Sequence, residues 1–564
     1  MSREEIKKAK ARMNDLYGEN HEISGKYDET LAVKCHNGIF LGKRNGSVLS
    51  WKGIPFAKPP IGTLRWKAPV PYPKSNTVRT AYFFGPSCIQ TKTFTEQASL
   101  YHQSEDCLYL NVWINETDSS KKKPVMVFIH GGSYGWGGTS DPLYEGTNFV
   151  AEYPDIVLVT IAYRIGIYGF MDFSSVPGGD QYPDSCNAGL LDQIEALKWV
   201  KKNISAFGGN PENITVFGES AGGGSVSILP VMPLAKGLFK KVIAESGSVA
   251  LTFSIEECQG LTEKLLKESG RSKMSELIDI PEDELAEINL ALNELNNFPM
   301  RDGRIVPEDL FEAYKRGDAA EIAMITGTNA DESRYWIGEL GGIQAYILQA
   351  PVLYENMYEM LTKTDKKRLD KFMSLKTDKK IWNESEFYTE ILFRIPSTKQ
   401  AELHTLSGGK TWVYYWTYPS AIENYKACHA VELAYVFNNL DEQIYTGNNI
   451  NPDLAKRVQQ MWVNFARTGN PSITNYIWPE YDAIDRNVMY IGELQGIVKD
   501  PMSAERKLLE PILKYGFNGT YTELNYNVPH IRKAAGQAVV LLAAVVGAVA
   551  GSIILIKKLR KGNK

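Results

Sequence analysis

Short runs of β-branched and aromatic residues recur along the chain, with helix-like stretches between them. The runs occupy residues 108–113, 125–129, 156–161, 214–217, 241–244, 322–326 and 412–418. Between two of them, Ile194, Leu197 and Val200 fall on one helical face. Runs that are apolar throughout suit strands buried on both sides, and helical connections permit parallel neighbours. The pattern predicts an α/β fold with a large, mostly parallel central sheet and helices on both faces.

The composition fits one large folded domain. Of the 564 residues, 43% are hydrophobic, and neither a linker-like stretch nor an internal repeat interrupts the chain before about residue 520. We expect a polar extension over residues 1–27 and a single domain over 28–525. The formal net charge of -4 leaves no basic stripe for a phosphate backbone, so nucleic acid is not an expected partner. No spacing of histidines and cysteines matches a metal site, and we expect no cofactor.

One strand-like run leads directly into a Gly-x-Ser-x-Gly pattern. Residues 214–217 are followed by Gly218, Glu219, Ser220, Ala221 and Gly222. A serine on a sharp strand-to-helix turn needs glycine two positions away on either side, because larger side chains would collide with neighbouring elements. The alternative is an ordinary glycine turn. The preceding strand favours Ser220 as a nucleophile.

A second strand-like run ends in a stretch of small residues. Residues 125–129 are followed by His130, Gly131, Gly132, Ser133 and Tyr134. Backbone N–H groups in such a stretch can point into one cavity and stabilise the oxyanion of an acyl-transfer transition state. The N–H of Ala221 would add to the same site. The alternative is a plain strand-to-loop turn.

A serine nucleophile of this kind needs an acid and a base later in the chain, in the order Ser, Asp or Glu, His. Only His404, His429 and His530 follow Ser220. Because His404 lies in a helix-like polar run and His530 lies beside a long apolar segment, His429 is the candidate base, with a structural histidine as the alternative. Spacing leaves the acid open, since Asp331, Glu332 and many others qualify.

A segment near the C-terminus has the length and composition of a membrane-spanning helix. Residues 534–556 contain no ionisable side chain, and a helix of this length would span roughly 35 Å. A linker over 526–533 precedes this segment, and a basic tail over 557–564 follows it. We expect a single-pass C-terminal anchor, with a buried core helix as the alternative. Gly547 and Gly551 form a small-xxx-small pair, which raises the hypothesis of a homodimer.

The orientation of the domain relative to the membrane stays open. The N-terminus is charged and has no apolar core, so no secretory signal is visible. This favours a cytosol-facing domain. The basic tail and six Asn-x-Ser/Thr sequons favour a lumenal or extracellular one.

Four longer motifs point to a known family. They are Phe-Gly-Glu-Ser-Ala-Gly at 217–222, Ser-Glu-Asp-Cys-Leu-Tyr-Leu-Asn at 104–111, Gly-Asn-Pro-Glu-Asn-Ile-Thr-Val-Phe-Gly at 209–218 and Glu-Ser-Gly-Ser at 245–248. With these motifs the chain resembles the type-B carboxylesterase/cholinesterase family over roughly residues 28–520. The resemblance implies an α/β-hydrolase fold and a serine carboxylesterase that acts on small-molecule esters.

The resemblance also implies roles for individual residues. It makes Ser220 the nucleophile, Glu332 the triad acid and His429 the base. It places the oxyanion donors at Gly132, Ser133 and Ala221. It sets Glu219 and Ser246 beside the triad, and it pairs Cys88 with Cys107 in a disulfide.

Two departures from the family pattern bear on function. Active esterases commonly have glycine or alanine at the position of Ser133, whereas non-catalytic relatives such as the neuroligins have a similar His-Gly-Gly-Ser-Tyr stretch. Serine keeps the backbone N–H that would donate to an oxyanion. No tryptophan lies between Cys88 and Cys107 to bind an ammonium group, so a cholinesterase is not expected. We predict ester hydrolysis through an acyl-enzyme. The alternatives are acyl transfer to an alcohol or amine, and a non-catalytic, neuroligin-like adhesion or binding function.

Overall fold

The computed structural model describes residues 18–90, 102–116, 121–292, 297–339, 354, 357–492 and 495–516. Its strands are β1 (Ala32–Cys35), β2 (Gly38–Leu41), β3 (Lys43–Asn45), β4 (Val48–Pro55), β5 (Val78–Thr80), β6 (Tyr109–Asn115), β7 (Lys123–Ile129), β8 (Val157–Ile161), β9 (Gly209–Glu219), β10 (Lys241–Glu245), β11 (Ala323–Asn329), β12 (Thr411–Trp416), β13 (Asn487–Ile491) and β14 (Gly496–Lys499).

The helices alternate with these strands. They are α2 (Thr147–Glu152), α3 (Gly166–Gly169), α4 (Ala188–Asn203), α5 (Ala221–Ile228), α6 (Ile255–Ser269), α7 (Met274–Ile278), α8 (Glu282–Ala291), α9 (Leu310–Arg316), α10 (Arg334–Glu339), α13 (Lys363–Ser374), α14 (Lys380–Tyr388), α15 (Ile395–Leu406), α16 (Leu433–Phe437), α17 (Pro452–Thr468) and α18 (Ser503–Leu509). A π-helical turn over Thr389–Arg394 joins α14 to α15.

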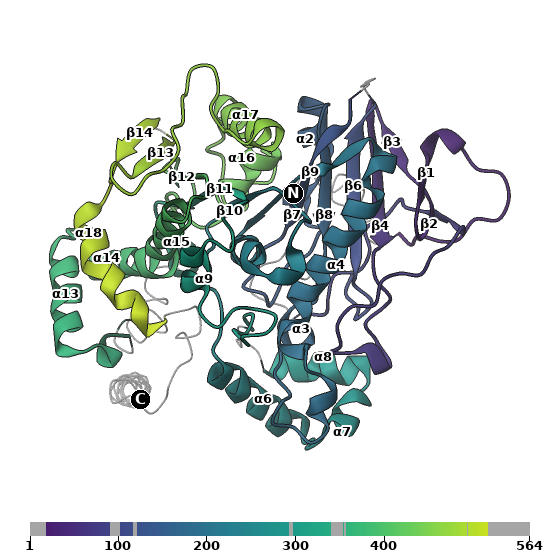
Figure 1. The fold of residues 1–564 in the computed structure, drawn as a ribbon, viewed down its shortest axis with the longest axis horizontal. Helices are drawn as coiled ribbons and strands as arrows, with labels where there is room; N and C mark the ends of the chain where they lie inside the picture. The colour runs from purple at the N-terminus through teal and green to yellow at the C-terminus, as the bar shows by residue number, and fades with distance from the viewer. Residues whose placement is uncertain are drawn as a thin grey trace, which may run out of the picture.

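Eleven strands of the described residues form one sheet, in the order β14-β13-β12-β11-β10-β9-β7-β8-β6-β4-β3 (Figure 1). Every neighbouring pair from β13 to β8 is parallel, and antiparallel pairs flank this central part at both ends. A smaller sheet, β1-β2-β5, lies beside the β3–β4 end. The predicted α/β architecture with a mostly parallel central sheet is confirmed.

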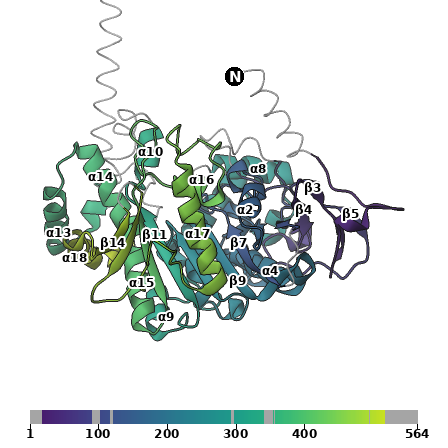
Figure 2. The same ribbon diagram turned by 90° about the horizontal axis from the view of Figure 1, so that it is seen from above.

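Alternate residues of the central strands face two separate cores. In β7, Val125, Val127 and Ile129 belong to one core, whereas Met126 and Phe128 belong to the other. The first core includes residues of α4 and α5, and the second includes residues of α16 and α17. Because side chains of a strand alternate between its faces, this division shows that helices cover both faces of the sheet. Figure 2 shows α17 running alongside the strands that it covers.

Helix α17 illustrates how local sequence sets an element's bounds. The side chain of Asn451 accepts a hydrogen bond from the Leu454 N–H at 3.0 Å, and Pro452 occupies a first-turn position that needs no N–H. Gly469, with φ of 80°, ends the helix in the left-handed conformation. The buried face carries Leu454, Val458, Met461 and Phe465.

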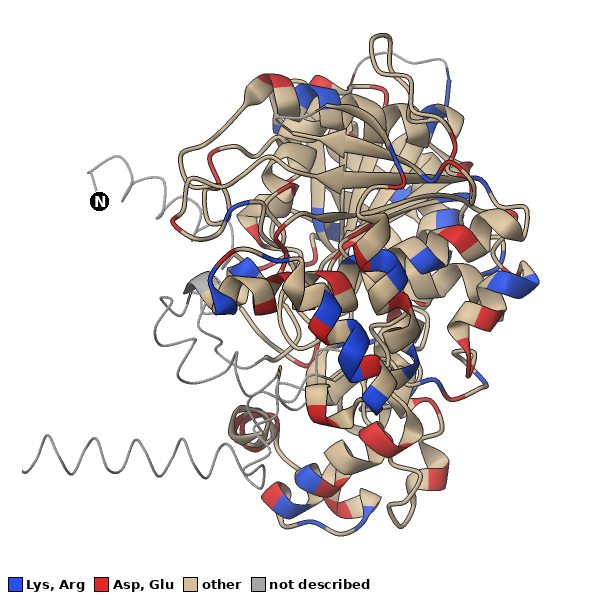
Figure 3. Cartoon of the chain, turned by 90° about the vertical axis from the view of Figure 1, so that its left-hand side faces the viewer, with Lys and Arg blue, Asp and Glu red and all other residues tan. Residues whose placement is uncertain are grey.

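Charged residues of both signs are interspersed on the face shown in Figure 3. Other charged residues are paired in the interior. Arg164 donates two hydrogen bonds to the carboxylate of Asp192, and this contact links the loop after β8 to α4. Arg65 and Glu105 form a second buried pair, and Nη1 of Arg65 also donates to the carbonyls of Ile278 and Ile280. Removal of one partner would leave the other as an unpaired buried charge, so the loss of either residue of a pair would destabilise the fold.

No helix within the described ranges combines the length and hydropathy needed to cross a membrane. The segment predicted to do so, residues 534–556, lies outside those ranges, as do Gly547, Gly551 and the basic tail. The anchor, the homodimer and the bounds of the domain therefore stay predictions.

Candidate active site

Ser220 lies at the junction between β9 and α5, where the chain turns sharply. Its φ of 57° and ψ of -121° are a strained conformation for a residue with a side chain, and 8% of the residue is exposed. The strain is held by two backbone bonds: the Ser220 N–H donates to the Glu245 carbonyl at 2.9 Å, and the Gly224 N–H donates to the Ser220 carbonyl at 2.8 Å. This geometry is that of the predicted nucleophile turn.

The two glycines flanking Ser220 are required by close backbone contacts. A Cβ on Gly218 would lie 2.7 Å from the Ile129 carbonyl oxygen, and a Cβ on Gly222 would lie 2.0 Å from the same atom. Both distances are too short for any side chain. The glycines therefore let β9 and α5 pack against the end of β7, which brings Ser220 next to the stretch after His130.

The stretch after β7 forms a tight loop beside Ser220. Gly132, Ser133 and Tyr134 have φ values of 102°, 51° and 56°. The N–H groups of Gly135 and Trp136 both donate to the Gly132 carbonyl, at 2.9 and 3.0 Å. Neither Gly132 nor Ser133 donates a backbone hydrogen bond to any described residue, so both N–H groups are available to a ligand.

Glu332 and His429 are hydrogen-bonded to each other. Oε2 of Glu332 lies 2.6 Å from Nδ1 of His429, and its Oε1 accepts from the Asn329 N–H at 2.7 Å. The backbone N–H of His429 donates to the Glu332 carbonyl at 3.1 Å. Glu332 is fully buried, and Asp331, the other acid that spacing allowed, instead contacts Arg334 at 3.1 Å. The structure therefore selects Glu332 as the partner of His429.

The other ring nitrogen of His429 faces Glu219. Its Nε2 lies 3.1 Å from Oε1 of Glu219, within ion-pair distance, yet neither atom has a partner with hydrogen-bond geometry. The Ser220 hydroxyl makes no hydrogen bond to His429. Since Glu219 directly precedes Ser220, the three residues Ser220, Glu332 and His429 all lie at the carboxyl edge of the parallel strands. Catalytic hydrogen bonds are often long in the absence of substrate and tighten when it binds.

Two aromatic rings cover the imidazole of His429. The ring centroids of Trp336 and Phe393 lie 4.8 and 5.0 Å from that of His429. Trp336 belongs to α10 and Phe393 to the π-helical turn, which is a form of helix common at functional sites. Nothing in the sequence pattern indicates either residue, because their contact with His429 depends on the tertiary fold.

Further carboxyl groups are buried around the triad. Burial raises the pKa of Glu219 well above its usual range, and the negative charges of Glu332 and Glu245 raise it further. Burial and the negative charge of Glu432 also raise the pKa of Glu245 well above its usual range. Burial and the negative charges of Glu219 and Glu332 raise the pKa of Glu432 to about 8. Burial and the mutual proximity of these carboxyl groups thus raise the pKa of all three around the Glu332–His429 pair.

Ser246 follows β10 at the same edge of the sheet. It is fully buried, has φ of 49°, and its N–H donates to the Gly327 carbonyl at 2.9 Å. Its hydroxyl has no hydrogen-bond partner among the described residues. Ser246 thus lies at the end of β10, between β9, which leads to Ser220, and β11, which leads to Glu332.

The profile of the Carboxylesterase family matches residues 29–508 of the chain. The chain belongs to this family. It is 36% identical over 503 residues to the para-nitrobenzyl esterase of Bacillus subtilis strain 168, which covers 85% of this chain and 98% of that protein. It is 32% identical over 494 residues to the liver carboxylesterase of Sus scrofa, covering 76% and 83%.

Solved structures agree with the sequence comparison. The crystal structure of the Geobacillus stearothermophilus carboxylesterase EST55 at pH 6.2 superposes with a TM-score of 0.76 at 32% identity, covering 85% of this chain and 99% of that one. A thermophilic pNB esterase superposes with a TM-score of 0.74 at 34% identity, with the same coverage. The α/β-hydrolase fold and the family, a group of carboxylic ester hydrolases, are confirmed.

The disulfide expected between Cys88 and Cys107 is absent from this member of the carboxylesterase family. Both residues are buried, free cysteines. A hydrogen bond between the two side chains, together with burial, raises the pKa of Cys107 well above its usual range. The prediction of a bridge is therefore wrong for this structure.

Two other features lie outside the active site. His404 is buried in α15, where Nδ1 lies 2.8 Å from Oγ1 of Thr411 and Nε2 lies 3.1 Å from the Ala319 carbonyl, so it is a structural histidine. No cluster of metal-ligating side chains occurs in the part of the chain that the structure describes.

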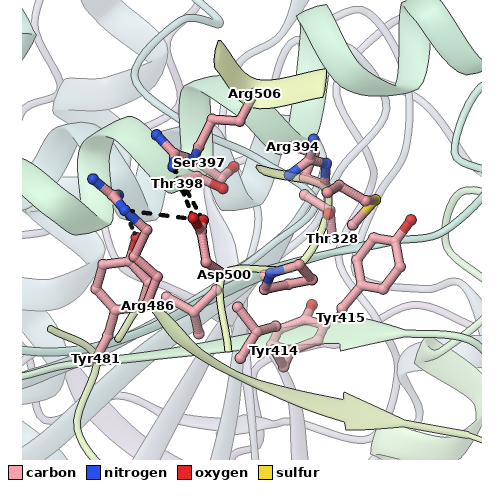
Figure 4. A pocket seen from close by; sticks show the side chains of 15 residues that line it. Thr328, Arg394, Ser397, Thr398, Tyr414, Tyr415, Tyr481, Arg486, Asp500 and Arg506 are labelled. Atoms are coloured by element: carbon pink, nitrogen blue, oxygen red, sulfur yellow. Dashed lines mark hydrogen bonds and ion pairs between the residues drawn. The ribbon is translucent and has the colours of Figure 1, made fainter. Parts of the chain in front are cut away.

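A small cavity of about 30 Å³ lies beside β11 and β12. Figure 4 shows Arg486 and Arg506 of its lining, both turned toward Asp500. The third arginine of this cavity, Arg394, forms two hydrogen bonds to Glu390. A space of this size holds about one water molecule. The paired arginines therefore stabilise the fold and leave no room for a substrate.

Proposed function

We propose that the chain hydrolyses carboxylic esters through an acyl-enzyme on Ser220. The observation that carries the proposal is the 2.6 Å bond between Glu332 and His429, at the same sheet edge as the strained Ser220. A histidine held by a buried carboxylate can act as a general base toward a neighbouring serine. The relatives named as carboxylesterases support the same reaction class.

The first half-reaction forms the acyl-enzyme. Nε2 of His429 takes the proton of the Ser220 hydroxyl as Oγ attacks the ester carbonyl carbon. The backbone N–H groups of Gly132, Ser133 and Ala221 stabilise the resulting oxyanion. The tetrahedral intermediate then collapses, the carbon–oxygen bond to the alcohol breaks, and His429 gives its proton to the departing alkoxide.

The second half-reaction releases the acid. His429 takes a proton from water, the hydroxide attacks the acyl carbon, and collapse returns the proton to Oγ of Ser220 as the carboxylic acid leaves. Glu332 accepts a hydrogen bond from Nδ1–H of His429 and holds the ring in the required tautomer. Acyl transfer follows the same path when an alcohol or amine replaces water, so it remains the alternative. A neuroligin-like binding function gains no support from a bonded Glu332–His429 pair.

Hydrolysis of p-nitrophenyl acetate by the full-length chain tests the proposal. We expect saturable turnover that Ser220→Ala lowers by at least about 10³-fold. Ser205→Ala is the matched control, because Ser205 is exposed in the turn before β9, at the opposite end of that strand from Ser220, and should leave the rate unchanged. A folded chain that neither hydrolyses the ester nor reacts with a fluorophosphonate probe would contradict an esterase and leave the adhesion function.

We also infer that residues 534–556 anchor the domain in a membrane by a single C-terminal helix. The support is the length of this segment without an ionisable side chain, followed by a basic tail. The six sequons offer a readout of orientation, since their glycosylation requires a lumenal domain.

A further inference from the structure

A second cavity borders the loops that carry Glu332 and His429. Its volume is about 210 Å³, and it lies between those loops and helices α10 and α14. Asp331, which lines it, directly precedes Glu332, and Lys426, which also lines it, stands three residues before His429. The cavity is separate from the reacting groups, yet it shares their supporting loops.

Two acidic side chains of this cavity share one arginine. Asp331 and Asp378 both contact Arg334, at 3.1 and 3.3 Å, and the Arg334 guanidinium also lies 4.2 Å above the Trp382 ring. Glu386 is paired with Lys376. Burial raises the pKa of Asp331 even though Arg334 and Lys426 oppose the shift. A further positive charge here would stabilise the Asp331 carboxylate.

Two other groups of the lining have no direct ion-pair or hydrogen-bond partner among the described residues. Lys426 is exposed and forms no ion pair with any described residue. Ser385 is 1% exposed, and its hydroxyl has no hydrogen-bond partner among the described residues. A buried hydroxyl without a partner costs free energy, which an acceptor on a ligand would recover. The lining thus offers carboxylates that a ligand's ammonium group could contact, and it offers an ammonium group and a hydroxyl from which a ligand's carboxylate could accept.

We propose that this cavity binds a small zwitterion of the amino-acid class. Its carboxylate accepts from Lys426 and from the Ser385 hydroxyl, and its ammonium group donates to the carboxylates around Asp331. A simple anion would face three carboxylates, and a simple cation would face Arg334 and Lys426, so a ligand with both charges fits best. The volume suits a ligand of amino-acid size.

The position of the cavity links its occupant to the triad loops. The Asp331 N–H donates to the Ala427 carbonyl at 2.9 Å, and the Ala427 N–H donates back to Oδ2 of Asp331 at 3.3 Å. These bonds join the loop of Glu332 to the loop of His429. A ligand bound to the Asp331 carboxylate therefore contacts the pair of hydrogen bonds that joins the loop of Glu332 to the loop of His429.

Calorimetric titration of the full-length chain with three ligands of one carbon skeleton tests the proposal. They are 4-aminobutyrate, which carries both charges, butyrate and butylamine. We expect 4-aminobutyrate to bind at least tenfold more tightly than either of the others. Equal affinity for a ligand of single charge, or no binding of 4-aminobutyrate at millimolar concentration, would overturn the assignment. The titration involves no catalysis, so its outcome is independent of the esterase assay.

Variants locate the binding. Lys426→Asn and Ser385→Ala should each weaken 4-aminobutyrate about tenfold, which is about 1.4 kcal/mol. Asparagine is chosen because Lys426 has φ of 50°, a conformation that asparagine tolerates. Lys410→Asn is the matched control, since Lys410 is also exposed but lies outside the cavity. Unchanged affinity in Lys426→Asn would place the ligand elsewhere and contradict the proposal.

Discussion

Oε2 of Glu332 lies 2.6 Å from Nδ1 of His429, although 97 residues separate the two in sequence. A second bond, from the His429 N–H to the Glu332 carbonyl, joins the same residues through their backbones. One bond fixes the ring tautomer and the other fixes the loop. The pair is therefore oriented before substrate arrives, which is what a general base in acyl transfer requires.

Replacing the acid should leave the fold intact and remove most of the activity. In Glu332→Gln the imidazole loses the carboxylate that holds its tautomer, and kcat for p-nitrophenyl acetate should fall about 10³- to 10⁴-fold with little change in KM. Glu480→Gln, at an exposed site, is the control and should match the wild type. Undiminished turnover in Glu332→Gln would show that another carboxylate supports His429.

The loop after β7, which we propose carries the oxyanion donors Gly132 and Ser133, should tolerate no side chain at Gly132. A Cβ there would lie 2.1 Å from the Trp136 carbonyl oxygen, so Gly132→Ala must displace the loop. Loss of one oxyanion donor costs about 10²- to 10³-fold in kcat. Gly408→Ala is the control for backbone strain, because Gly408 has φ of 95°, close to the 102° of Gly132, with no atom within 4 Å of its Cβ position. Equal activity in the two variants would remove this loop from the mechanism.

The buried carboxyl cluster should make stability depend on pH. The folded-state pKa of Glu432 is about 8, above the ordinary value of 4.5. Between these values the folded state binds more protons than the unfolded state, so the free energy of unfolding falls as pH rises through this window. The contribution of one such group approaches about 1.4 kcal/mol per pH unit.

Glu432→Gln should remove that contribution, because an amide does not ionise. We expect the melting temperature of the variant to fall less than that of the wild type between pH 5 and pH 8.5. Glu423→Gln, at an exposed site nine residues before Glu432, is the comparison. The same fall of melting temperature with pH in the wild type and in Glu432→Gln would contradict a raised pKa for Glu432 in the folded state.

The C-terminal anchor should fail when charges enter its centre. Each arginine at the middle of a spanning helix costs about 2.5 to 3.5 kcal/mol. The wild type should stay in the membrane fraction after alkaline extraction, and Val545→Arg combined with Val549→Arg should move to the soluble fraction. Alanine at both positions is the control. Retention of the double arginine variant would contradict anchoring by residues 534–556.

Local features of the active site were predictable from sequence. The turn around Ser220 requires glycines at fixed positions, and β9 and α5 place them where the pattern predicts. The choice between Asp331 and Glu332 could not come from spacing, because adjacent residues of a loop differ only in the direction of their side chains. The resemblance selects Glu332, and its bond to His429 agrees.

Contacts that depend on tertiary packing were missed. Glu245 and Glu432 lie far apart in the chain and meet only at the sheet edge, and Phe393 reaches His429 from a π-helical turn that has no sequence signature. Strands β1 to β5, β13 and β14 lie outside the predicted runs as well; β3 and β14 are edge strands with exposed residues, whereas β4 and β13 are largely buried. Edge strands and long-range contacts follow from the whole fold rather than from a local pattern.

The most direct test of the central claim is to find which residue becomes covalently modified. The full-length chain is treated with a fluorophosphonate, digested, and mapped by mass spectrometry, with wild type compared to Ser220→Ala. We expect a single adduct on the peptide that carries Ser220, and none in the variant. An adduct on another residue, or equal modification of Ser220→Ala, would contradict Ser220 as the activated nucleophile.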